Sequence, residues 1–454
     1  MRSFKKISLL FCLAVLQFLQ TTAQTLPRIK ISANKRFFVT ADNKPFFWLG
    51  DTGWLLFSKL NMKEAEQYLE DRKQKGFNVI QVMLLHELNM SCPDGDHRIP
   101  ALIDKNVAKP NVTKGYDYWD RVDEIVKLAE QKGLYMALVP VWGGNVKSGG
   151  VNSSQAKAYA SFLANHFKNM SNIIWMDGGD IKGSDSIEVW RTIGATLKAN
   201  DPGHLITFHP RGRSTSSTWF HNEPWLDFNM FQSGHKDYAQ DTTEPRIGED
   251  NWKFAENDYA LSPTKPTIDG EPSYEGIPHG LHEANQPYWT DNDVRRYAYW
   301  SVFAGGAGFT YGHNAVMQFY SAGDAGTSFF PKVKWQEGMQ APGSSQMQYL
   351  KQLMLSKPYL ERIPDQTLVI DNGEKYNRVI STRGKTYAMF YVYNARKFKV
   401  ALNKLKFIPK KATWFSAVDS QVIEIKDYKY TAEKSFDPPG EKVNGNDWVL
   451  ILEK

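Results

Sequence analysis

The sequence predicts an α/β fold, a (β/α)8 TIM barrel followed by a small all-β sandwich domain. Between residues 45 and 354, short apolar runs alternate with longer segments of helical periodicity. This alternation is typical of buried parallel strands connected by helices. After Pro358 the runs are short, rich in β-branched and aromatic residues and separated by turn residues, which indicates an all-β domain.

Eight apolar runs qualify as barrel strands, at 45–51, 77–85, 134–142, 172–176, 204–209, 226–232, 266–271 and 306–312. Helices are expected at 63–75, 116–132, 153–169, 186–200, 291–303 and 344–356. A doubly wound open sheet would carry a glycine-rich phosphate loop after its first strand, and Gly50-Asp51-Thr52-Gly53 lacks that spacing. A strand-like segment at 28–39 precedes the barrel and has the pattern to pair with either domain.

Residues 1–23 have the layout of a secretory signal peptide. Arg2, Lys5 and Lys6 precede an apolar run at 7–19, and Thr21-Thr22-Ala23 resembles a cleavage site. The run is too short to span a bilayer, so we expect an exported protein, periplasmic or extracellular, with no membrane span after cleavage. The predicted organisation is a leader at 1–23, a catalytic barrel with its N-terminal strand segment at 24–357, and a β-sandwich at 358–454.

The composition argues against several functions. Three of the six net positive charges lie in the leader, and the other charges are interspersed, so no nucleic-acid partner is expected. Without the leader, Cys92 is the only cysteine, which excludes an internal disulfide. No H-E-x-x-H spacing and no G-x-S-x-G elbow occurs, and we expect neither a metal nor a cofactor. The 14 Trp and 21 Tyr suit a protein that stacks sugars on aromatic rings.

Two carboxylates are the predicted catalytic residues. Active sites of barrels lie at the C-terminal ends of the strands, where Asp180 follows the fourth strand and Glu271 ends the seventh. Glycosidic hydrolysis needs one carboxyl group to protonate the leaving oxygen and another to attack or to activate water. Asp177 is an alternative acid or a supporting partner, and a capping or turn role is the structural alternative for Asp180.

Further polar and aromatic residues at the strand ends are candidates for substrate binding. They are Asp51, Trp54, His86, Glu87, Trp142, His209, His235, Tyr274 and Tyr311. Hydrogen bonding to hydroxyl groups and stacking on sugar rings are the expected contacts, with core packing or helix capping as the structural alternative.

Several of these segments resemble the apiosidase-like glycoside hydrolases, family 140. The resemblance rests on Phe46-Phe47-Trp48-Leu49-Gly50-Asp51-Thr52, Gly178-Gly179-Asp180, Gln232-Ser233-Gly234-His235, Gly270-Glu271-Pro272 and Tyr311-Gly312. The segments 436–440 and 445–450 resemble the β domain that often follows this barrel, labelled "putative collagen-binding".

The resemblance implies that Asp180 is the acid/base, that Glu271 is the nucleophile, and that the substrate is a pectic glycan with apiose linkages. Asp177 departs from the family pattern, and a carboxylate so close to Asp180 is expected to raise one pKa of the pair. The long polar segment 86–115 is a second departure, which bears on the shape of the sugar pocket. We therefore predict an exported, two-carboxylate, retaining glycosidase. The alternatives are a glycosidase for a different sugar and a non-catalytic glycan-binding or adhesion protein.

Overall fold

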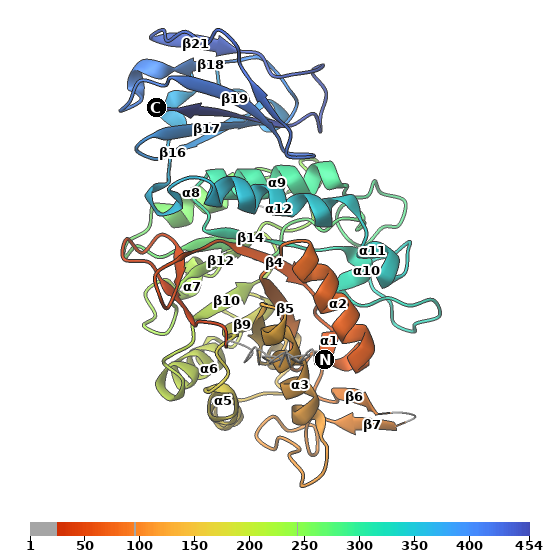
Figure 1. Cartoon of the computed structure of the whole chain (residues 1–454). Helices are drawn as coiled ribbons and strands as arrows, with labels where there is room; N and C mark the ends of the chain where they lie inside the picture. Colours follow the sequence, from red (N-terminus) through yellow and green to blue (C-terminus); the bar gives the residue numbers. More distant parts are fainter. Residues whose placement is uncertain (1–24, 95–96, 243) are drawn as a thin grey trace, which may run out of the picture.

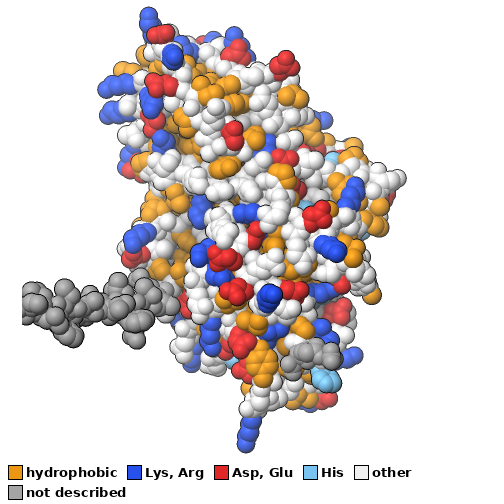
Figure 2. Space-filling view, turned by 45° about the vertical axis from the view of Figure 1, so that its right-hand side comes forward, with side chains coloured by type: hydrophobic (Ala, Val, Ile, Leu, Met, Phe, Trp, Pro, Cys, Tyr) orange, Lys and Arg blue, Asp and Glu red, His pale blue; other side chains and the backbone are white. Residues whose placement is uncertain are grey.

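The computed structural model describes residues 25–94, 97–242 and 244–454, so the predicted signal peptide lies outside the described residues. Within these ranges, no helix is both long and apolar enough to cross a membrane. Lysine and arginine side chains alternate with acidic ones over the face seen in Figure 2.

Among the described residues, eight parallel strands form the predicted barrel (Figure 1). They are β4 (Trp48–Thr52), β5 (Val79–Met83), β8 (Tyr135–Val139), β9 (Ile173–Ile181), β10 (Ile206–Pro210), β12 (Asn229–Gln232), β13 (Thr267–Asp269) and β14 (Gly308–Tyr311). Parallel ladders join neighbours from β10 through β9, β8, β5, β4, β14 and β13 to β12. The ring closes between β10 and β12, where Asp227 N donates to Ile206 O at 2.9 Å.

A helix follows each barrel strand. These helices are α2 (Met62–Gln74), α3 (Tyr118–Gln131), α5 (Ser153–Phe167), α6 (Ile187–Asn200), α7 (Ser217–Phe220), α8 (Trp252–Tyr259), α9 (Asp291–Phe303) and α12 (Pro342–Leu355). The periodicity predicts six of these helices, whereas α7 and α8 were not predicted. Shorter helices lie in the connections, namely α1 (Leu56–Lys59), α4 (Gly143–Lys147), α10 (Asn314–Met317) and α11 (Trp335–Gly338). The long polar segment contains a hairpin of β6 (Ser91–Asp94) and β7 (His97–Pro100), and β11 (Ser214–Thr215) pairs with β12.

The strand-like segment before the barrel packs against the barrel. It forms an antiparallel sheet of β1 (Ile29–Ile31), β2 (Phe38–Thr40) and β3 (Pro45–Phe46). The ring of Phe38 lies 5.0 Å from that of Phe228 and 6.0 Å from that of Trp48, which begins β4. The sheet therefore covers the N-terminal ends of the barrel strands, on the side away from the expected site.

The C-terminal domain consists of two facing antiparallel sheets of unequal size. The larger contains β15 (Ile363–Pro364), β16 (Val379–Arg383), β17 (Tyr387–Val392), β22 (Trp448–Glu453), β19 (Lys411–Ser416) and β20 (Val422–Glu424), and the smaller pairs β18 (Phe398–Ala401) with β21 (Glu433–Phe436). Single turns of 3-10 helix occur at η1 (Tyr359–Glu361), η2 (Gln366–Leu368), η3 (Lys375–Asn377) and η4 (Leu402–Lys404). Phe398 of the smaller sheet contacts Phe390 and Trp414 of the larger one, with ring centroids 6.2 and 6.1 Å apart.

The other face of the larger sheet packs on α9 of the barrel (Figure 1). Tyr391 stacks on Tyr299 of α9 with ring centroids 4.6 Å apart. Beside this stack, Arg295 of α9 contacts Asp447 at 2.9 Å, with both side chains buried. The hydroxyl of Tyr391 donates to the same carboxylate at 3.0 Å. Apolar packing and a buried ion pair therefore hold the two domains together.

Replacement of Asp447 by Ala is expected to destabilise the protein by about 3–5 kcal/mol, because the buried Arg295 loses its main counter-ion. Urea unfolding followed by tryptophan fluorescence measures the loss. Asp42→Ala removes an exposed ion pair with Lys44 and serves as the control, with no measurable effect expected. A D447A variant as stable as the control would show that the interdomain pair contributes little.

Candidate active site

A cavity of about 750 Å³ opens at the C-terminal ends of the barrel strands. Both predicted catalytic carboxylates, Asp180 and Glu271, line it. Five of the predicted substrate-binding residues line it as well, namely Trp54, His86, Trp142, His235 and Tyr274. Its size is within the range of small-molecule and oligosaccharide sites.

A bulge in β9 presents Asp180 to the cavity. His209 of β10 pairs with Gly178 and the next residue, Pro210, pairs with Ile181, so Gly179 and Asp180 are extra residues in the ladder. Gly178 and Gly179 have φ of +88° and +106°. A Cβ on Gly179 would lie 2.5 Å from the ring of Trp142. Glycine is therefore required here by both backbone conformation and space.

Two histidines hold the side chain of Glu271. His235 Nε2 hydrogen-bonds Glu271 Oε1 at 3.2 Å, and His209 Nε2 lies 3.1 Å from Oε2. The Nδ1 atoms of both rings accept backbone N–H groups, from Asp180 for His209 at 3.2 Å and from Tyr274 for His235 at 3.4 Å. Since an accepting nitrogen carries no proton, each neutral ring carries its proton on Nε2, the nitrogen that lies nearest to Glu271.

These surroundings push the two carboxyl pKa values apart. Burial acts to raise the pKa of Glu271, but the imidazoles of His209 and His235 outweigh it and lower the pKa to about 2. The side chain of Asp180 faces the open cavity, where desolvation and the charge of Glu271 raise its pKa. Its one hydrogen bond from a described residue is a long one of 3.4 Å from Gly212 N. Glu271 is thus suited to be ionised while Asp180 carries a proton.

The aromatic residues surround His209 rather than forming one flat platform. The rings of Trp54 and Trp142 lie 5.4 and 6.0 Å from the His209 ring and 5.4 Å from each other. His209 itself is fully buried and is not part of the cavity lining, so it acts on Glu271 rather than on a ligand. Glu87 is exposed and also lies outside the lining, unlike its neighbour His86.

Asp51 and Tyr311 do not fit the predicted role in substrate binding. Asp51 is fully buried and accepts a hydrogen bond from Tyr68 at 2.6 Å, with Arg72 at 3.1 Å, and both partners belong to α2. The hydroxyl of Tyr311 donates to the buried Glu275 at 2.6 Å. Successive side chains of a strand point to opposite faces, and these two point into the layer between strands and helices.

Asp177 is likewise separate from the site. It is fully buried, accepts a hydrogen bond from Gly178 N at 2.9 Å and does not line the cavity. Burial raises its pKa, and no charge of Asp180 contributes. The expected coupling between the two carboxylates is therefore wrong, because Asp177 lies on the same strand face as Trp175, which contacts Asp201 beyond α6.

Basic side chains of the cavity were not predicted. Lys182, Arg211 and Lys236 line it within one or two residues of Asp180, Pro210 and His235. The sequence signal that could have indicated these basic residues was their position close to the predicted strand ends. Arg213 also lines the cavity, but its guanidinium is bound by Asp241 and by the carbonyls of Ser233 and Gly248.

A closed parallel barrel with two carboxyl groups lining one cavity is an arrangement that glycosidic hydrolysis can use. The comparisons with known proteins agree. A structure described as a "Glycoside hydrolase" superimposes with a TM-score of 0.89 at 45% identity, covering 94% of this chain and 97% of that chain. A glycoside hydrolase family 5 structure from Bacteroides vulgatus gives a TM-score of 0.89 at 43% identity, covering 94% of each chain.

Residues 32–361 match the family profile of the apiosidase-like catalytic domain. The chain belongs to this apiosidase-like family of glycoside hydrolases. Residues 363–453 match a second profile, described as "putative collagen-binding domain of a collagenase". No curated protein matches the chain significantly.

Substitution of Gly179 by Ala is expected to destabilise the protein by about 1–3 kcal/mol more than a matched glycine replacement, because the added methyl group meets the Trp142 ring. Gly149 has a similar φ of +81°, and a methyl group added there would have nothing within 4 Å, so Gly149→Ala reports the conformational cost alone. Denaturant unfolding of both variants gives the difference. Equal losses would contradict tight packing at the bulge.

Proposed function

We propose that the protein is an exported glycosidase that removes a sugar from an anionic, pectic polysaccharide, with apiose linkages as the first candidates. The observation that carries the anionic substrate is the group of basic residues Lys182, Arg211 and Lys236 in the cavity. Among the described residues, none of the three has an ion-pair or side-chain hydrogen-bonding partner. The galacturonate backbone of pectin would supply carboxylates to these cations.

A substrate that bears carboxylates would therefore supply the counter-ions that the basic residues of the cavity lack. Asp180 and Glu271 are the two acidic residues among the described ones that line the cavity. The three basic residues outnumber them, which favours an acidic polymer over a neutral one. Family membership and the apiosidase-like profile support apiose as the released sugar. The signal-peptide pattern of residues 1–23 supports export.

In the proposed mechanism, Asp180 and Glu271 act in two displacements. The Asp180 carboxyl group protonates the glycosidic oxygen while Glu271 attacks the anomeric carbon, the C–O bond breaks, and the aglycone leaves as an alcohol. The Asp180 carboxylate then takes a proton from water, whose oxygen attacks the anomeric carbon and releases Glu271 as a carboxylate. Overall one water is consumed and the anomeric configuration is retained.

This assignment sets the direction of the pH dependence. Activity needs Glu271 ionised, so it falls at low pH as the pH approaches the Glu271 pKa of about 2. It also needs Asp180 protonated, so it falls as the pH rises through the raised pKa of that group.

Sugar release from a panel of pectic glycans, including rhamnogalacturonan II fragments, tests the function. We expect Glu271→Gln to lower kcat/KM by about 10⁴-fold or more, and Asp180→Asn by about 10²–10⁴-fold. Asp177→Asn is the matched control, since this neighbouring carboxyl group lies outside the cavity, and it should keep most of the activity.

Four outcomes of this experiment are decisive. Release of a sugar other than apiose would keep the mechanism and reject the apiose assignment. Full activity of E271Q would reject the mechanism, and an inverted first product in proton NMR would reject the retaining pathway. A wild-type protein that binds glycans without cleaving any would favour the glycan-binding alternative.

Neutralisation of Lys236 tests the anionic substrate. Lys236→Met is expected to raise KM on a de-esterified fragment about threefold to tenfold, because one charge pair is lost. Methyl esterification of the fragment should raise KM of the wild type and have little further effect on K236M, since both changes remove the same interaction. Lys157→Met on the exposed face of α5 is the control. Additive effects of esterification and K236M would contradict a direct contact.

A further inference from the structure

One wall of the cavity is a loop that begins at the end of β12 and returns to α8. We name its outgoing leg (233–241) and its returning leg (247–251) together the cavity loop. Its outgoing leg carries His235, which hydrogen-bonds Glu271, and the unpaired Lys236. The position of this loop therefore determines how His235 meets the proposed nucleophile, Glu271. It also determines where Lys236 would meet the proposed substrate.

Arg213 and Asp241 hold the two legs of the cavity loop together. Arg213 Nη1 donates to Ser233 O at 2.8 Å on the outgoing leg and to Gly248 O at 2.7 Å on the returning leg. Asp241 accepts the N–H groups of Ile247 at 2.9 Å and Gly248 at 2.7 Å. A displacement of the returning leg is therefore transmitted to the outgoing one.

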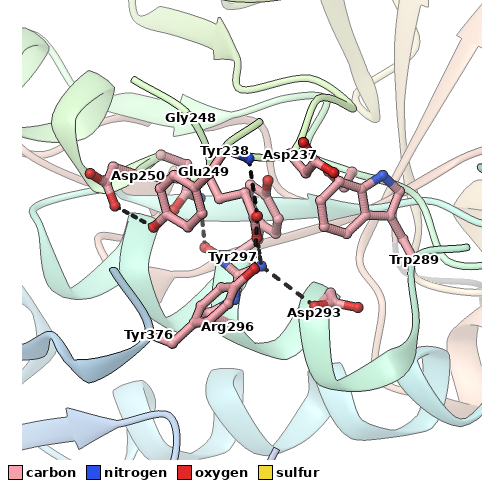
Figure 3. A network of polar contacts seen from close by, with 12 residues as sticks. Asp237, Tyr238, Gly248, Glu249, Asp250, Trp289, Asp293, Arg296, Tyr297 and Tyr376 are labelled. Carbon is pink, nitrogen blue, oxygen red and sulfur yellow. Dashed lines mark hydrogen bonds and ion pairs between the residues drawn. The ribbon is translucent and has the colours of Figure 1, made fainter. Parts of the chain in front are cut away.

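Asn251, at the end of the returning leg, donates to Asp269 Oδ2 at 3.1 Å and to Tyr297 O at 2.9 Å. The Glu249 carboxylate attaches the same leg to both domains (Figure 3). This carboxylate is 1% exposed. Its Oε2 accepts a hydrogen bond from Arg296 of α9 at 2.6 Å. Its Oε1 accepts one from the hydroxyl of Tyr376 at 2.8 Å and a longer one from Tyr238 N at 3.3 Å. Arg296 and Tyr376 come from different domains, so both domains bind the same carboxylate.

The surroundings of Arg296 also come from both domains. Its guanidinium lies 4.8 and 4.9 Å from the ring centroids of Tyr297 and Trp300 on α9, and 5.0 and 5.3 Å from those of Tyr376 and Tyr393 in the C-terminal domain. The charge is fully buried, and Glu249 is its closest counter-ion. A buried ion pair of this kind depends on every donor that its carboxylate receives.

We propose that Tyr376 of the C-terminal domain is a positioning residue of the active site, acting through Glu249 on the cavity loop. Without its hydroxyl group, Glu249 Oε1 keeps only the long contact from Tyr238 N, and the returning leg loses its hydrogen bond to the C-terminal domain. The loosened loop then holds His235 less firmly against Glu271. The last step rests on the proposed role of Glu271, whereas the ordering of the loop does not.

Tyr376→Phe in the full chain tests this proposal, with Tyr387→Phe as the matched control. Tyr387 belongs to the same domain, and its hydroxyl reaches Pro358 O at 3.4 Å, away from the cavity loop. Hydrogen–deuterium exchange of peptides covering the two legs should become about tenfold faster in Y376F and stay unchanged in Y387F. The acid limb of the pH profile for sugar release should move to higher pH in Y376F, because weaker donation from His235 raises the pKa of Glu271.

A merely structural role for Tyr376 predicts that Y376F lowers the melting temperature but changes neither of the other measurements. The hydrogen–deuterium exchange rate of the cavity loop and the acid limb of the pH profile would then be the same as in Y387F. That result would overturn the proposal. Faster exchange with an unmoved acid limb would also overturn it, since the loop would then not position the catalytic carboxylate. Failure of the proposed function looks different. In that case E271Q would be as active as the wild type, and the exchange rates would still show whether the Tyr376 hydroxyl orders the loop.

Discussion

The arrangement of the active site depends on two imidazole N–H groups that face one carboxylate. His235 and His209 can present N–H to Glu271 only because their other ring nitrogens accept backbone N–H groups. One of those backbone groups belongs to Asp180, the second catalytic candidate. The bulge of β9 therefore places the proposed acid, Asp180, and through its amide fixes the tautomer of His209 beside the proposed nucleophile, Glu271.

The periodicity of the sequence was sufficient to predict the barrel, because buried parallel strands and amphipathic helices leave different patterns. That Glu271 and Asp180 line the cavity was predictable for a related reason, since active sites of barrels lie at the C-terminal ends of the strands. Asp51, Asp177 and Tyr311 lie at the same ends but belong to the opposite strand face. An error of one residue in the predicted end of a strand reverses the face of every side chain, so the sequence alone could not separate these residues from those that line the cavity.

The basic residues of the cavity were missed for a different physical reason. Lys182, Arg211 and Lys236 lie just beyond the strands, in loops whose direction no periodic pattern reports. Long flexible side chains reach a cavity from many backbone positions, and most lysines and arginines near strand ends are simply solvated. Only the closed ring, which brings β9, β10 and β12 to one rim, shows that the three charges share a space.

The C-terminal domain packs closely on the barrel. One face of its larger sheet is covered by its own smaller sheet and the other by α9, through Tyr391, Arg295 and Asp447. A loop of the domain also reaches the barrel, where the Tyr376 hydroxyl donates to Glu249. This arrangement makes the domain a part of the enzyme's framework.

The unequal environments of Asp180 and Glu271 also account for how one acid can serve in both proposed steps. The negative charge of Glu271 helps to keep the pKa of Asp180 raised. When Glu271 becomes a glycosyl ester that charge disappears, so the pKa of Asp180 falls just after it has given up its proton. Asp180 then remains a carboxylate long enough to take a proton from water. The charge distribution of the cavity is thus suited both to an acidic polymer and to the change of role that retention demands of Asp180.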